Sequence, residues 1–293
     1  MSPLSAARKA AVGGEFDFSD VDFKTIADQL YEETGIHLQP SKATLVYSRI
    51  AKRLRALGLE SFRDYCALVG DAAGADEKAQ MISALTTNVT RFFREPHHFE
   101  HFKTKLLPRL LAMARKGQKV RIWSAGCSSG QEPFSIALSI LSAAPDARSL
   151  DIRILATDIN PHVLAMGRKG QYSAGEIADV PTDLRRAWAE ETQAGGEKSY
   201  QLDDAVLGLV SFRALNLMGN WPMRGTFDAI FCRNVVIYFD EQTQFRIWNR
   251  ILPLLGPGSF LYIGHSERVA GPAQQHFRIE GTTIYRKVTG DAS

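Results

Sequence analysis

The sequence predicts an α/β protein with a doubly wound, Rossmann-like sheet, an all-helical domain before it and a small inserted subdomain. Three observations support this. Helical periodicity dominates the first hundred residues, a strand, glycine turn and helix follow from about residue 119, and apolar strands then alternate with helices to about residue 288. A length of 293 residues suits one large domain with a smaller companion.

The composition is that of a globular protein. Apolar residues make up 45% of the chain, and 35 basic against 32 acidic residues give a net charge of +3. Near neutrality argues against a general nucleic-acid binder. No uncharged stretch reaches the ~18 residues of a membrane span, and no signal peptide is recognisable, so we expect a cytoplasmic protein without membrane insertion. Cys66, Cys127 and Cys232 are too few and too widely spaced for a disulfide framework or a cysteine zinc site.

Two helices open the predicted helical domain. Apolar residues recur with helical spacing from Phe23 to Tyr31, after a Ser19-x-x-Asp22 capping signal and before Gly35. A second helix is expected from about Lys42 to Leu57. Its apolar stripe leaves four basic side chains on the solvent arc: Arg49, Lys52, Arg53 and Arg55. They form either an ordinary solvated face or a docking surface for an acidic partner.

The segment TTNVTRFFRE, residues 86 to 95, follows another helical stretch around residues 79 to 85. Its hydroxyl and amide side chains, aromatic pair and two arginines suit a loop that reaches into a site, although the phenylalanines alone also suit a core. Three histidines follow at positions 97, 98 and 101. We expect no metal there, because no acidic residue or cysteine stands at a spacing that fixes a coordination geometry.

The α/β part begins with a strand at Val120–Trp123, followed by a turn containing Gly126 and Gly130 and a helix with Pro133 in its first turn. Such a turn lets the backbone approach a ligand at a helix start. The spacing is looser than the dinucleotide fingerprint and lacks the P-loop lysine. A second strand, Ile152–Ala156, ends at Asp158, where a carboxylate can accept hydrogen bonds from a ribose; capping the next helix is the alternative.

Further strands are predicted at 209–215, 227–232 and 260–263, with a helix at 240–255 and a closing hairpin at 277–288 that turns at Glu280-Gly281. Five parallel strands with an antiparallel edge pair resemble the S-adenosylmethionine methyltransferase variant of this fold. The predicted division is a flexible tail (1–18), a helical domain (19–90), linker helices (91–118), a cofactor domain (119–288) with an insertion at 171–206, and a C-terminal tail (289–293).

Five segments together resemble the CheR-type chemoreceptor glutamate methyltransferases. They are LTTNVTRFFRE (85–95), WSAGCSSGQEPFSIA (123–137), ATDIN (156–160), FDAIFCRNVVIYFD (227–240) and LYIGHSE (261–267). Their order and spacing match, and the acidic-then-basic helical start resembles the family's N-terminal domain. The chain departs from the family pattern at Gln131, where an acid is usual, and at Gly126, where alanine is common.

The resemblance implies S-adenosylmethionine as cofactor, S-adenosylhomocysteine as product and no metal. Matched positions imply that Asn88, Thr90 and Arg94 border the methionine end and that Glu132 lies near the amino-acid moiety. Asp158 is implied to hold the ribose, with Asn216 and Leu217 beside the adenine. Gly126, Arg233 and Asn234 complete the cofactor set, and Arg94 and Tyr238 are the implied catalytic residues that position the substrate glutamate.

The implied partner is the acidic cytoplasmic coiled coil of a chemoreceptor, which favours the docking interpretation of Arg49, Lys52, Arg53 and Arg55. Some family members also bind a receptor tail through a β-subdomain, at the place that 171–206 occupy here. We expect a monomer. Two alternatives stay open: a methyltransferase for another protein or a small acid, and a cofactor-binding adaptor without turnover. Arg233-Asn234-Val235-Val236 is not the loop of a nucleic-acid amine methyltransferase.

Overall fold

The computed structural model describes residues 10–12 and 14–288, so the ends of both predicted tails, 1–9 and 289–293, lie outside the described residues. The chain forms two compact units. The smaller comprises the chain up to Thr87 together with Tyr238–Asp240, and the larger comprises the remainder from Asn88. Each unit encloses its own apolar core.

The smaller unit is mainly helical. Its elements are β1 (Ala10–Val12), β2 (Phe18–Ser19), α1 (Asp20–Thr34), the 3-10 turn η1 (Pro40–Lys42), α2 (Ala43–Leu57), α3 (Phe62–Gly70), the 3-10 turn η2 (Ala72–Gly74) and α4 (Ala75–Leu85). The predicted helix start is confirmed, because Ser19 and Asp22 form a capping box at α1 and Gly35 ends the helix in the left-handed conformation at φ 75°.

The prediction of a flexible tail is wrong for residues 10–12 and 14–18. β1 pairs antiparallel with β2, and Phe18 is 1% exposed in the core of the smaller unit. The ring of Phe18 lies 4.4 Å from that of Phe62, centroid to centroid. Burial of its aromatic ring supplies free energy that holds Phe18 in place.

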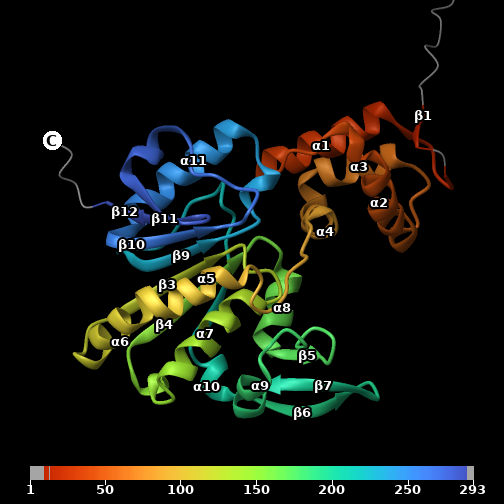
Figure 1. The fold of residues 1–293 in the computed structure, drawn as a ribbon. Helices are drawn as coiled ribbons and strands as arrows, with labels where there is room; N and C mark the ends of the chain where they lie inside the picture. The colour runs from red at the N-terminus through yellow and green to blue at the C-terminus, as the bar shows by residue number, and fades with distance from the viewer. Residues whose placement is uncertain (1–9, 13, 289–293) are drawn as a thin grey trace, which may run out of the picture. The chain divides into compact units, whose positions relative to one another are not determined.

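A seven-stranded sheet organises the larger unit (Figure 1). Its strands are β3 (Val120–Ala125), β4 (Ile152–Asp158), β8 (Val210–Ala214), β9 (Phe227–Cys232), β10 (Leu255–Ile263), β11 (Phe277–Gly281) and β12 (Ile284–Lys287). The order is β11-β12-β10-β9-β3-β4-β8. β8, β4, β3, β9 and β10 are parallel, and β12 runs antiparallel to both β10 and β11, which confirms the predicted sheet.

Helices cover both faces of this sheet, with α6 and α7 on one face and α11 on the other (Figure 1). The helical elements are α5 (Pro96–His101), the π-helical turn η3 (Phe102–Leu106), α6 (Leu107–Arg115), α7 (Gln131–Ala143), η4 (Ala147–Ser149), α8 (Pro161–Lys169), η5 (Val236–Tyr238), α11 (Glu241–Ile251), η6 (Leu252–Leu254) and η7 (Gly271–His276). Coverage of both faces explains why β3 is apolar and buried along nearly its whole length.

A separate antiparallel sheet lies within the segment predicted to be inserted. It consists of β5 (Gln171–Ser173), β7 (Glu197–Leu202) and β6 (Ala189–Ala194), in that order, with α9 (Thr182–Trp188) before β6 and α10 (Asp204–Leu207) after β7. Tyr172 ties this sheet to the α/β core, because its hydroxyl donates to the carbonyl of Ser129, which follows β3, at 2.7 Å.

The closing hairpin forms where predicted but turns elsewhere. Thr282 and Thr283 make the turn, with Thr283 at φ 57°, whereas Gly281 lies at a register shift in β11. The predicted turn at Glu280-Gly281 is therefore wrong by two residues, because glycine here serves a β-bulge. Within the described ranges, no helix combines the length and the apolar character needed to span a bilayer.

Candidate functional site

The carboxyl ends of β3 and β4 bring the predicted glycine turn against Asp158. The backbone amides of Ser128 and Asn160 donate to the two Asp158 carboxylate oxygens at 2.8 and 2.9 Å. Gly126 and Gly130 both have positive φ, at 77° and 98°. A Cβ on Gly126 would lie 2.3 Å from Cγ2 of Val235, so glycine lets the loops after β3 and β9 approach closely.

Glu132 and Arg233 form a buried ion pair beneath this turn. Arg233 Nη1 lies 3.1 Å from Glu132 Oε2, and the Ser124 hydroxyl donates to Glu132 Oε1 at 2.7 Å. Burial raises the pKa of Glu132, although the Arg233 charge opposes that shift. Arg233 Nε is buried and has no hydrogen-bond partner among the described residues. The Nε–H group of Arg233 can therefore donate a hydrogen bond to a ligand.

The segment before α5 lies against the same turn. Ser128 Oγ donates to the carbonyl of Asn88 at 3.0 Å, and Arg233 donates to the carbonyl of Arg94. The Arg94 guanidinium donates to the carbonyl of Val89 at 3.0 Å. The side chain of Thr90, which follows Val89, is half-buried. The structure therefore brings the backbone of Asn88 and of Arg94 against Ser128 and Arg233.

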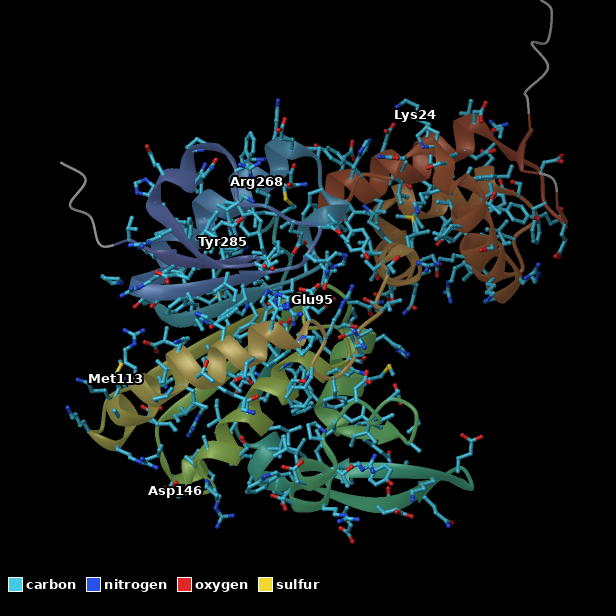
Figure 2. All side chains as sticks on the ribbon, in the orientation of Figure 1. Lys24, Glu95, Met113, Asp146, Arg268 and Tyr285 are labelled. Carbon is cyan, nitrogen blue, oxygen red and sulfur yellow. The ribbon has the colours of Figure 1, made fainter. Side chains whose placement is uncertain are left out.

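Glu95, labelled in Figure 2, joins several of these groups. Its Oε2 lies 3.3 Å from Arg233 Nη2, and its Oε1 accepts from His265 Nδ1 at 2.9 Å and from Asn234 Nδ2 at 3.4 Å. Burial would raise the pKa of Glu95, but the His265 hydrogen bonds and the Arg233 charge lower it to about 2. Glu95 is thus an anion that fixes Arg233.

Glu267 holds the loop after β9. Its carboxylate accepts hydrogen bonds from the amides of Asn234, Val235 and Val236 at 2.8–2.9 Å, and from those of Ile237 at 3.3 Å and Gly264 at 2.5 Å. Successive backbone N–H groups make an anion-binding concavity, which this carboxylate fills. The loop conformation includes Asn234 at φ 58°.

Neither Glu95 nor Glu267 was predicted as a site residue. Both end segments that carry the family resemblance, FFRE and GHSE, and an acid in such a segment is a signal that sequence reasoning can use. Their roles depend on contacts between residues far apart in sequence. Glu95 accepts from the Asn234 side chain, 139 residues away, and Glu267 accepts from the Asn234 amide, 33 residues away.

Asn216 and Leu217 follow β8 at the same edge of the sheet. Asn216 Oδ1 accepts from the Met218 amide at 2.8 Å, and the carbonyl of Leu217 accepts from Arg250 at 2.7 Å and from the Trp221 indole at 3.2 Å. The Arg250 guanidinium also stacks over the Trp221 ring at 4.0 Å. These contacts hold the segment in one conformation.

The remaining predicted residues belong to the smaller unit. Tyr238 is there because its carbonyl accepts from the His37 amide at 2.8 Å. Lys52 and Arg55 are exposed, and Arg55 pairs with Glu15 at 2.7 Å.

The expectation that all four bases of α2 lie in solvent is wrong for two of them. Arg49 donates to the carbonyls of Ala84 and Thr86 at 2.9 Å, at the end of α4. Arg53 makes two hydrogen bonds, at 2.9 and 2.6 Å, with the carboxylate of Glu77, which is 8% exposed. Both guanidiniums serve packing within the unit, because a buried carboxylate and a helix C-terminus each need a donor.

Two family models match the chain. The CheR methyltransferase SAM binding domain matches residues 88–286, and the CheR methyltransferase all-alpha domain matches residues 21–86. The chain belongs to the CheR methyltransferase family. It is a methyltransferase with a domain for S-adenosylmethionine, on the Rossmann-like fold with an N-terminal helical part that the sequence predicts.

Curated relatives cover nearly the whole chain. A probable chemotaxis protein methyltransferase of Rhizobium etli is 52% identical over 260 residues, covering 89% of this chain and 97% of the relative. Chemotaxis protein methyltransferase 2 of Pseudomonas aeruginosa is 38% identical over 290 residues, covering 97% and 99%. The Escherichia coli chemotaxis protein methyltransferase is 38% identical over 273 residues, covering 91% of both chains.

The residues at the carboxyl edge fit S-adenosylmethionine. The unpartnered Arg233 Nε beside Glu132 offers a donor and an acceptor, which suit the carboxylate and ammonium of an amino acid. A carboxylate has about four lone-pair positions, so Asp158 keeps capacity for a ribose hydroxyl beyond the backbone amides of Ser128, Asn160 and Ile159. Positive-φ glycines clear space beside these groups.

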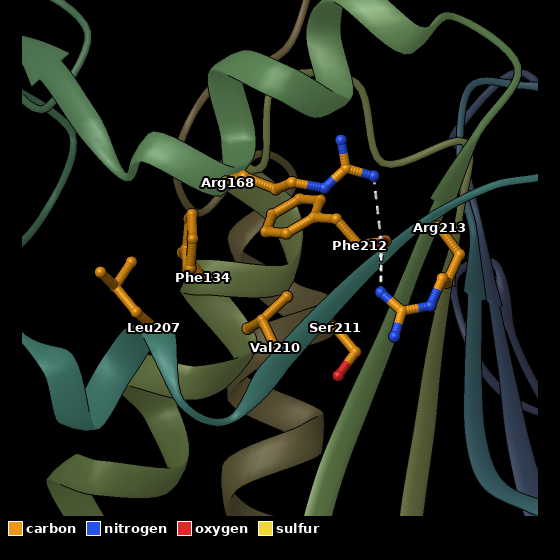
Figure 3. A pocket seen from close by; sticks show the side chains of 7 residues that line it. All are labelled: Phe134, Arg168, Leu207, Val210, Ser211, Phe212 and Arg213. Atoms are coloured by element: carbon orange, nitrogen blue, oxygen red, sulfur yellow. Dashed lines mark hydrogen bonds between the residues drawn. The ribbon is translucent and has the colours of Figure 1, made fainter.

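A pocket of about 220 Å³ lies elsewhere, along the edge strand β8 (Figure 3). Its lining comprises Phe134, Arg168, Leu207, Val210, Ser211, Phe212 and Arg213, none of them a predicted site residue. The guanidiniums of Arg168 and Arg213 both donate to the carbonyl of Phe212, at 3.3 and 2.8 Å. They cover a carbonyl of the open edge and so discourage pairing with another strand.

Proposed function

We propose that this protein transfers the methyl group of S-adenosylmethionine to γ-carboxylates of glutamates in the cytoplasmic coiled coil of chemoreceptors. The products are glutamate methyl esters and S-adenosylhomocysteine, and the reaction serves sensory adaptation in the cytoplasm. The observation that carries the proposal is the match of both CheR domains along one chain, with relatives named chemotaxis protein methyltransferases over almost their full length.

The cofactor roles follow the contacts at the carboxyl edge. Glu132 and Arg233 bind the amino-acid end, with Asn88, Thr90 and Arg94 beside it. Asp158 binds the ribose, and Asn216 and Leu217 flank the adenine. Support comes from the buried Glu132–Arg233 ion pair and from the hydrogen bonds that fix Asp158 and Leu217. These contacts preorganise the groups for a ligand.

The chemistry requires positioning rather than a general base. S-adenosylmethionine supplies a methyl group on a cationic sulfur. A glutamate, with a pKa near 4.3, is already an anion at pH 7, so no residue has to remove a proton. Because charge is lost as carboxylate and sulfonium react, a site that excludes water from the carboxylate favours the transition state. Arg94 and Tyr238 orient the carboxylate; an arginine that bound it too strongly would lower its nucleophilicity.

Methyl transfer to receptors tests this function. Radiolabelled S-adenosylmethionine is incubated with membranes that contain candidate receptors, and the label is then treated with base, which releases methyl esters. Base-labile label on the receptor supports the proposal. Label only on another protein or on free acids, or tight S-adenosylhomocysteine binding without turnover, identifies one of the alternative functions instead.

Substitution of the positioning residues tests their roles. We expect Arg94→Ala to lower kcat roughly 100-fold, because misplacement of a reacting group costs about that much. Tyr238→Phe removes one hydrogen bond and lowers kcat about 10-fold. S-adenosylhomocysteine affinity, measured by calorimetry, stays largely unchanged for both. Arg91→Ala is the matched control, since Arg91 is exposed and pairs only loosely with Asp179 at 3.6 Å. Normal turnover in both variants removes these residues from catalysis.

A further inference from the structure

Glu95, His97 and His98 lie close together at the start of α5. One ligand atom of each lies within 4.8 Å of those of the other two. This corrects the reason given for expecting no metal, because the structure does set a carboxylate beside the histidines. The group belongs to the larger unit and is outside the set of residues assigned to the cofactor or the substrate.

The contacts of His98 favour one position for the ring proton. The Thr283 hydroxyl donates to the carbonyl of Thr282 at 2.7 Å, so its oxygen accepts from His98 Nε2 at 2.9 Å. With the hydroxyl in that orientation Nε2 is the protonated nitrogen, and Nδ1 of the neutral ring presents a lone pair.

The lone pair of His98 faces a second acceptor. His98 Nδ1 lies 3.5 Å from Glu95 Oε2, and both atoms are buried without a hydrogen-bond partner among the described residues, although Glu95 Oε2 is ion-paired with Arg233 Nη2 at 3.3 Å. His98 is fully buried. Two acceptors that face each other without water repel, and a cation between them removes that cost. Ligands about 2.0–2.1 Å from a tetrahedral zinc ion stand about 3.4 Å apart, close to this separation.

His97 has the same arrangement. Its Nε2 lies 3.2 Å from the carbonyl of Thr282, which only accepts, so Nε2 is protonated and Nδ1 carries the lone pair. Metal-binding histidines usually donate their other ring N–H to a carbonyl, carboxylate or hydroxyl group in this way, which fixes the ring and its tautomer. The 282–283 turn of the closing hairpin thus orients both imidazoles.

We propose that Glu95, His97 and His98 form a binding site for a divalent transition metal of the zinc type. Two imidazole nitrogens and one carboxylate oxygen are a ligand set that Zn²⁺ takes, with a further position for water or the neighbouring His265. Arg233 lies 3.3 Å from the same Glu95 oxygen, but Glu95 and Glu132 balance it with two carboxylates, so the metal enters a group with a net negative charge.

Zinc titration of the full-length, metal-free protein without a histidine tag tests the site. Calorimetry with ZnCl₂ should show one saturable site per chain, and Co²⁺ as a substitute probe should give the visible absorption of a tetrahedral site. His98→Asn should abolish the site. His97→Ala, at an exposed position that does not endanger folding, should weaken binding more than about 10-fold, a loss seen even for outer-sphere partners.

His276→Ala is the matched control, because His276 is an exposed histidine outside the cluster and its loss should leave the affinity unchanged. Absence of saturable zinc binding overturns the proposal. Binding of equal affinity in His97→Ala and the unsubstituted protein also overturns it, since the metal then sits elsewhere. Neither outcome bears on methyl transfer, so the site and the proposed function fail independently.

Discussion

At the scale of single residues, Glu267 shows how one side chain can organise a functional loop. Five backbone amides, from Asn234 to Ile237 and from Gly264, donate to its carboxylate. The loop carries Asn234 and follows Arg233, two of the proposed cofactor residues. Glu267 touches no reacting atom in this arrangement and acts as a positioning residue.

Removal of this carboxylate should therefore damage stability and cofactor binding together. We expect Glu267→Ala to lower the free energy of unfolding by about 2–4 kcal/mol, because buried amides lose their acceptor. S-adenosylhomocysteine affinity should fall as well, since the loop no longer holds Arg233 in place. Chemical denaturation and calorimetry measure the two effects.

Arg268→Ala provides the comparison for this variant. Arg268 is adjacent and exposed, and its loss should change neither quantity by more than about 0.5 kcal/mol. If Glu267→Ala unfolds at the same denaturant concentration as the unsubstituted protein, the five amides find other partners and the positioning role is wrong.

At the scale of elements, α2 carries two kinds of basic side chain. Some form hydrogen bonds within the smaller unit, and others are exposed and available to a partner. The apolar stripe of the helix is predictable, since Val46, Ile50 and Leu54 are all buried. The positions of the arginines are not, because they depend on Glu77 and on the end of α4, more than 20 residues away in sequence. Arg53 and Arg49 hold the unit together, whereas Lys52 is exposed without an ion pair among the described residues.

Charge reversal on α2 should accordingly have two different results. Arg53→Glu sets a second carboxylate against Glu77 and should lower the free energy of unfolding by at least about 3 kcal/mol. Lys52→Glu should leave unfolding unchanged and slow receptor methylation several-fold at low salt, with the difference lost at high salt, because steering by charge is screened. Methylation rates at two ionic strengths, beside denaturant unfolding, separate the effects. An unchanged rate for Lys52→Glu at low salt returns this face to ordinary solvated surface.

For the other elements too, features set by local sequence could be predicted, whereas features set by distant contacts could not. Caps, strands and the parallel sheet with its antiparallel edge pair follow from sequence patterns, as at Ser19, Gly35 and β9, and these predictions are confirmed. The errors at the Thr282-Thr283 turn and at β1 and β2 arise because contacts with residues distant in sequence decide these conformations. The site roles of Glu95 and Glu267 were not predicted for the same reason. Each residue meets its hydrogen-bond partners only when separate strands end at one edge of the sheet.

At the scale of the whole molecule, two separate apolar cores suggest two units of stability. The core of the smaller unit contains residues from Phe18 to Leu85, and that of the larger unit contains residues from Phe92 to Ile284. The proposed cofactor residues all belong to the larger unit. A ligand stabilises only the unit whose folded state binds it.

Hydrogen exchange with S-adenosylhomocysteine tests this division. At 100 times its Kd the ligand adds about 2.7 kcal/mol, so amides of β3, β4 and β9 that exchange by opening of the larger unit should slow about 100-fold. Amides of α3, in the smaller core, should exchange at an unchanged rate. ATP at the same concentration controls for a general effect of an adenine nucleotide. Equal slowing in α3 and β3 would mean that the two cores open as one cooperative unit, because only then does the binding free energy protect residues that share no core with the site.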